Sequence, residues 1–141
     1  MTALSITAAN VKYINGPILA DQVAGEAFIA GAEVYQLADG TWKKAQCDGT
    51  ALEAGSKNLG MALFTADAAG ARGSIGLRDA VVQVAASGLA VGVPYCVGRT
   101  AGSLVPVADL LSTDKVTIAA LSISATQLQL CRDYNDGAVL A

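Results

Sequence analysis

The chain has 141 residues and a formal net charge of −3, and 53% of its residues are hydrophobic although only 5% are aromatic. Its length predicts a single domain with a core of its own. The few basic residues exclude the large positive surface typical of nucleic-acid binding, and no apolar run is long enough for a membrane-spanning helix. The N-terminus lacks a basic region followed by an apolar core, so we expect a protein made in the cytosol without a secretory signal.

The N-terminal region, residues 1–20, is predicted to be an arm. Its first ten residues mix Ser, Thr and Ala without periodicity, so we expect their order to depend on a neighbouring molecule. Residues 11–14 favour a short strand, and Asn15-Gly16-Pro17 is typical turn sequence. The β-rich domain is predicted to span residues 21–134, and residues 135–141 form a predicted C-terminal tail.

Residues 31–45 contain the clearest local pattern of the chain. Val34 and Tyr35 favour a strand, Asp39-Gly40 supplies a turn in which glycine adopts positive φ, and Trp42 begins a second extended run. This stretch predicts a β-hairpin. A second hairpin is predicted around Gly102, between the strand that holds Tyr95 and the one that begins at Leu104.

The remaining segments also read as short strands and turns. Residues 52–58 favour a short helix or helical turn, residues 66–73 a loop, and residues 77–86 a Val-rich strand. Pro94 interrupts an alternating run, which indicates an edge strand or a bend. Residues 115–124 and 127–130 predict a hairpin, with a bulge near Ala119-Ala120 where the apolar alternation shifts.

Together these segments predict an all-β protein. The chain contains about eight to ten short strands separated by Gly-rich turns, with at most one or two short helical turns. This spacing predicts a compact sandwich or barrel.

The sequence offers little catalytic chemistry. The chain contains no histidine, the commonest general base and metal ligand. The glycines of residues 70–76 do not match a phosphate-binding loop, and residues 133–137 lack the glutamate that completes a calcium loop. Cys47, Cys96 and Cys131 are expected to be buried small hydrophobes. We therefore expect no enzyme, cofactor or metal, with a hydrolase that uses two carboxylates as the least favoured alternative.

The aromatic residues are too few and too scattered for a nucleic-acid or sugar platform. Large apolar side chains carry much of the energy of cores and subunit contacts. The candidate interface residues are Tyr13, Ile14, Phe28, Tyr35, Trp42 and Tyr95.

Several motifs follow one another in a recognisable order. They are Val34-Tyr35, Asp39-Gly40-Thr41-Trp42-Lys43, Leu59-Gly60-Met61-Ala62-Leu63, Ser87-Gly88-Leu89, Val116-Thr117-Ile118-Ala119 and Leu128-Gln129-Leu130. Over residues 24–132 this order resembles the small Ala/Gly-rich capsid decoration, or cement, proteins of tailed bacteriophages.

This resemblance implies a structural protein of the virion. It implies a homotrimer on the outside of the head, made in the host bacterial cytoplasm, that bridges neighbouring major capsid proteins and stabilises the shell. It gives no role to nucleic acid or membrane. The alternative from the same class of particle is a head-fibre base or a tail module.

Overall fold

The computed structural model describes residues 4, 6–50, 52–85, 89–106, 109–110 and 114–139, with side chains described as far as residue 133. These residues form eleven strands and one 3-10 turn, η1 (Ala8–Asn10), which confirms the all-β prediction. The strands are β1 (Lys12–Asn15), β2 (Ile18–Val23), β3 (Glu33–Gln36), β4 (Trp42–Lys44), β5 (Leu59–Ala62), β6 (Arg72–Gly76), β7 (Val81–Gln83), β8 (Pro94–Val97), β9 (Leu104–Pro106), β10 (Lys115–Ser122) and β11 (Gln127–Val139). Within the described residues, no helix has the length and apolar character that crossing a membrane requires.

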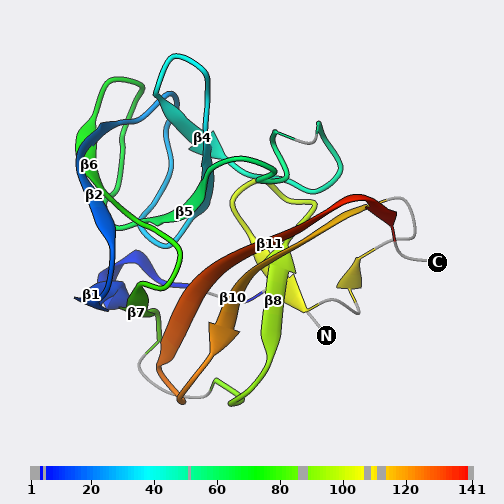
Figure 1. Ribbon diagram of the computed structural model, residues 1–141. Helices are drawn as coiled ribbons and strands as arrows, with labels where there is room; N and C mark the ends of the chain where they lie inside the picture. Colours follow the sequence, from blue (N-terminus) through cyan, green and yellow to red (C-terminus); the bar gives the residue numbers. More distant parts are fainter. Residues whose placement is uncertain are drawn as a thin grey trace.

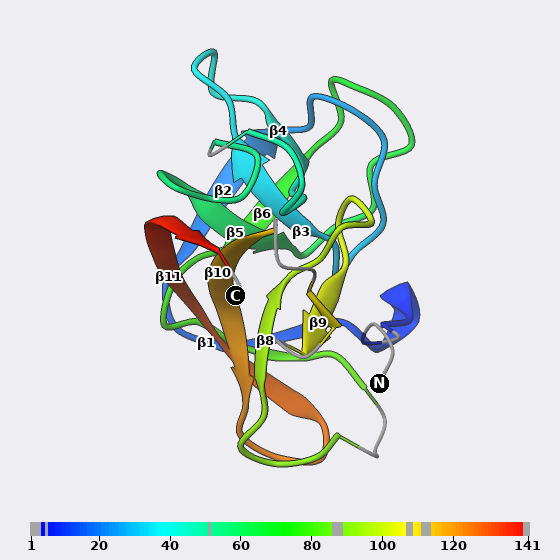
Figure 2. The ribbon, with the colours of Figure 1, turned by 90° about the vertical axis from the view of Figure 1, so that its right-hand side faces the viewer.

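The strands form two antiparallel sheets that pack as a sandwich. One sheet has six strands in the order β1-β7-β11-β10-β8-β9, and the other has five in the order β2-β6-β5-β3-β4 (Figure 1). Figure 2 shows the five-stranded sheet above the six-stranded sheet. The five-stranded sheet curls until Ala24 and Trp42, near its two ends, form an isolated parallel bridge. Neither sheet closes into a barrel, so of the two predicted architectures, sandwich and barrel, the structure has the sandwich.

Two hydrophobic cores result from this curl. The main core lies between the sheets and contains Tyr35 and Met61 from one sheet and Leu128 from the other. A smaller core, around Val34 and Trp42, fills the other face of the five-stranded sheet. Val34 and Tyr35 lie in different cores because successive side chains of a strand point to opposite faces.

The three predicted hairpins are all present. β3 pairs with β4 across a turn in which Gly40 has φ +90° and Asp39 accepts hydrogen bonds from the Thr41 N–H and hydroxyl at 3.0 and 2.7 Å. β8 pairs with β9, and β10 with β11. The register shift between Ile118 and Ala120 confirms the predicted bulge.

Several local predictions differ from the structure at their boundaries. β6 begins at Arg72, inside the predicted loop. The helical turn predicted for residues 52–58 is shorter than expected: residues 52–55 form a turn in which the Ala54 N–H donates to the Thr50 carbonyl at 3.1 Å. β11 continues to Val139 because its backbone pairs with β10 as far as Lys115, although residues 133–137 have turn composition. β1 and the first half of β2 lie within the predicted arm, whose residues 1–3 and 5 lie outside the described residues. The division into arm, domain and tail stays a prediction.

Candidate interaction surface

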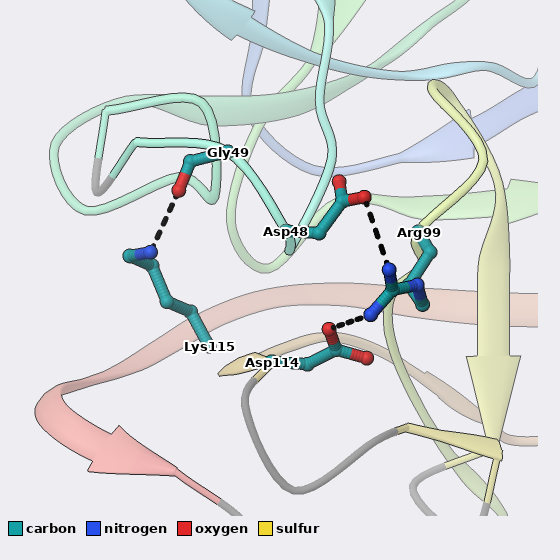
Figure 3. A network of polar contacts seen from close by, with 5 residues as sticks. All are labelled: Asp48, Gly49, Arg99, Asp114 and Lys115. Atoms are coloured by element: carbon teal, nitrogen blue, oxygen red, sulfur yellow. Dashed lines mark hydrogen bonds and ion pairs between the residues drawn. The ribbon is translucent and has the colours of Figure 1, made fainter.

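Arg99 forms a network of charges that joins the two sheets (Figure 3). It follows β8, and its Nη1 lies 2.7 Å from Asp114 Oδ1 at the start of β10, while its Nη2 lies 3.6 Å from Asp48 Oδ2 in the turn after β4. The Lys115 ammonium donates a hydrogen bond to the Gly49 carbonyl at 2.6 Å. Asp114 is fully buried, whereas the Arg99 side chain is about half in water. The contacts attach the β4 turn of one sheet to strands of the other.

Two buried thiols, that of Cys47 beside this network and that of Cys96 in β8, are held in their neutral forms. Burial, followed by the nearby Asp114 and Asp48 carboxylates, raises the pKa of the Cys47 thiol to about 12. Burial raises the pKa of Cys96 to about 11. Because the thiolate is the nucleophilic form, these thiols are poor nucleophiles at neutral pH. In the part of the chain that the structure describes, no cluster of three or more His, Cys, Asp or Glu is placed to hold a metal ion.

Glu33 is an acid inside the apolar core between the sheets. It is only 1% exposed, and its Oε1 has no hydrogen-bond partner among the described residues. Burial raises the pKa of this carboxyl well above its ordinary value. The pKa of the Cys131 thiol is also raised, first by burial and then by the charge of Glu33. An unpaired buried acid favours its protonated form.

Four large apolar side chains are exposed along residues 12–21, named here the edge strip. Every residue of the strip is exposed. The exposed fractions are 45% for Tyr13, 42% for Ile14, 38% for Ile18 and 36% for Leu19. β1 is the end strand of the six-stranded sheet and β2 the end strand of the five-stranded sheet, so the strip passes from one open sheet edge to the other (Figure 1). Open edges with apolar side chains favour association with another chain.

A tight turn holds the strip on the outside of the molecule. Gly16 has φ +99°, and a Cβ there would lie 2.6 Å from Ala80 Cα. The Leu77 N–H donates to the Pro17 carbonyl at 3.1 Å, and the Tyr13 hydroxyl donates to the Gly16 carbonyl at 2.6 Å. Glycine is required at this position because any other residue adds strain and a backbone clash.

The edge of β2 is interrupted near its middle. The pairing of β2 with β6 shifts register between Leu19 and Gln22, and Asp21 in this bulge has φ +57°. The Asp21 carboxylate lies 3.3 Å from the Arg72 guanidinium. Bulges and charges on edge strands limit indiscriminate strand pairing. The open part of the β2 edge is therefore short and includes Ile18 and Leu19.

The structure separates the six candidate interface residues into two groups. Phe28, Tyr35, Trp42 and Tyr95 are buried within the single chain. The Phe28 and Phe64 rings pack edge to face with their centroids 5.3 Å apart, and the Trp42 indole N–H donates to Gln22 Oε1 at 3.0 Å. Tyr13 and Ile14 are exposed on the strip. Four candidates thus stabilise the fold, and two remain accessible to a partner.

Sequence reasoning missed Ile18 and Leu19. Two adjacent apolar residues after Pro17 suggest an ordinary buried strand, but neighbours in a strand point to opposite faces. Both are exposed because β2 is the end strand of its sheet. The useful signal was the position of this pair directly after the turn that links two end strands.

An apolar groove of about 570 Å³ lies on another side, beside the N-terminal segment. Leu4 and Ile6 form part of its wall, and the Leu4 N–H donates to the Leu104 carbonyl at 2.8 Å. Gly31 allows the segment to lie close, since a Cβ there would be 2.5 Å from Ile6 Cγ2. The segment extends the outer edge of β9 through this bond.

Comparison with protein-family models, with curated proteins and with solved structures finds no significant match to this chain.

Proposed function

We propose that this chain is a structural virion protein that binds the outside of an assembled phage head and bridges neighbouring major capsid proteins. The class of protein rests on the order of motifs that resembles the phage decoration proteins. The observation that carries the proposal is the edge strip, where the open edges of both sheets meet around four exposed apolar side chains. Such edges suit association between β-rich proteins.

A single contact through the strip is weak. Burying a large apolar side chain completely is worth about 1.5–3 kcal/mol, and the four side chains of the strip are 36–45% exposed. Together they supply roughly 2–5 kcal/mol. This range lies near the ~4 kcal/mol of millimolar binding, before the costs of association are subtracted.

Weak contacts of this size require multivalency. In the proposed mechanism a homotrimer engages several capsid subunits at once, so the second and third contacts form at high effective concentration. The protein binds the assembled lattice and not dispersed capsid subunits. It therefore raises the free energy needed to separate them.

The test is sedimentation of the purified protein alone and with expanded phage heads that lack it. Saturable co-sedimentation, together with an increased thermal stability of the heads, is the expected result. The double variant Ile14→Thr/Ile18→Thr should lose occupancy. The control Val91→Thr/Ile123→Thr removes two exposed aliphatic side chains outside the strip and should keep it. A folded protein that does not bind heads would overturn the proposal in favour of a tail or fibre module.

A further inference from the structure

A cleft of about 210 Å³ opens beside the edge strip. Leu19, a residue of the strip, also lines the cleft. The buried Trp42 and Leu59 form apolar parts of its lining, together with Leu77 from the segment between β6 and β7. The cleft thus lies between β2 and the β3–β4 hairpin, where the curled five-stranded sheet does not close.

The charged lining of the cleft is entirely positive. Lys57, Arg78 and Arg132 line it, and among the residues that the structure describes no Asp or Glu does. These are three of only nine basic residues in a chain whose net charge is −3. Asp79 and Asp133 are the sequence neighbours of the two arginines, but neither lines the cleft.

The cations of the cleft have few partners of their own. The Arg132 guanidinium donates to the Ser56 carbonyl at 3.0 Å, a neutral acceptor that leaves its charge uncompensated. Among the described residues, neither Lys57 nor Arg78 forms an ion pair. Cations gathered in a concave, partly apolar site attract an anion more strongly than the same charges spread over a surface.

We propose that this cleft binds an acidic side chain of a protein partner that docks on the edge strip. The guanidinium fork of arginine matches the planar carboxylate, and the apolar lining accommodates the methylene groups that carry it. A segment that pairs with the open edge of β2 passes Leu19, so its side chains reach the cleft. Only the identity of the partner rests on the proposed function.

The binding test uses two matched peptides and the tryptophan of the cleft. Trp42 is the only tryptophan of the chain, so its fluorescence reports on this site. The peptides are acetyl-Thr-Val-Glu-Val-Thr-amide and the same peptide with Gln in place of Glu. The Glu peptide should bind about tenfold more tightly, since hydrogen bonds to charged groups add more than neutral ones. This preference should disappear below about pH 4, where the glutamate becomes protonated.

Charge-matched variants separate the cleft from the charge of the whole protein. Lys57→Gln/Arg78→Gln should abolish the preference for the Glu peptide. Lys43→Gln/Lys44→Gln lowers the net charge equally outside both the cleft and the edge strip and should retain it. Equal loss in both variants, equal binding of the two peptides, or stronger binding of inorganic phosphate than of the Glu peptide would overturn the inference.

The same variants distinguish this inference from the proposed function. If the protein coats heads but does not discriminate the peptides, the cleft inference fails and the proposed function stands. If it discriminates the peptides but ignores heads, the capsid proposal fails and the acidic-peptide site stands.

Discussion

Replacement of Glu33 by methionine is expected to stabilise the protein. Leaving a buried polar atom without a partner costs about 1–3 kcal/mol, and Glu33 Oε1 is such an atom. Methionine has a similar volume, and a repacked core of this kind loses less than about 1.5 kcal/mol. The middle of these two ranges gives a net gain of about 1 kcal/mol, which raises the melting temperature by roughly 4 °C for a domain of this size.

The pH dependence of the free energy of unfolding is a second, independent test of the buried Glu33 carboxyl. Because burial raises the pKa of this carboxyl in the folded chain, the unfolded chain loses the proton at lower pH. The contribution of Glu33 to stability is therefore most favourable below its unfolded pKa, about 4, and declines as pH rises toward the folded pKa. The wild-type protein should lose more stability than Glu33→Met between about pH 5 and about pH 7.5, below the range of the thiols.

Thermal unfolding followed by circular dichroism measures both effects. Glu26→Met is the matched control, because Glu26 Oε2 accepts the Lys44 N–H at 2.8 Å. The same substitution should therefore lower stability at that position. A Glu33→Met variant that melts below the wild type, or that keeps the wild-type dependence on pH, would refute the reasoning.

Three further predictions concern the sheets and the strip. Arg99→Gln should lower the free energy of unfolding, measured in urea, by roughly 2–3 kcal/mol. This is less than the loss on breaking a fully buried ion pair, because water partly compensates the broken contacts. A change below ~0.5 kcal/mol would contradict a linking role for the network. Gly16→Ala should cost at least about 1 kcal/mol through its positive φ and its clash with Ala80, and an unchanged melting temperature would contradict the tight turn. Ile14→Thr/Ile18→Thr should stay within about 1 kcal/mol of the wild type, since each exposed substitution shifts stability by about 0.5 or less; a larger loss would place these side chains in the fold.

The hairpins were predictable because their signals are local. Asp39 and Gly40 specify a turn by their own conformational preferences, and the bulge near Ala119 follows from a shift in the apolar alternation. The extension of β11 past residue 133 depends on pairing with β10, which overrides turn composition.

The surface was harder to predict because exposure depends on the order of strands in each sheet. Trp42 is the kind of residue that anchors interfaces, yet the curl of the five-stranded sheet creates a second core that buries it. Ile18 suggests a core strand, yet β2 is at the end of its sheet. The basic cleft joins residues as distant in sequence as Lys57 and Arg132, and no local pattern indicates it.

The residues that stabilise the fold are different from the residues that are exposed for contact with a partner. The main core and the Arg99 network join the sheets, whereas the edge strip is attached to each sheet through one strand only. Loss of an exposed side chain of the strip removes contact area from a complex while leaving the core packed. Binding and stability should therefore respond to different substitutions: strip and cleft variants should remain folded but lose a partner, and Arg99 variants should lose stability first.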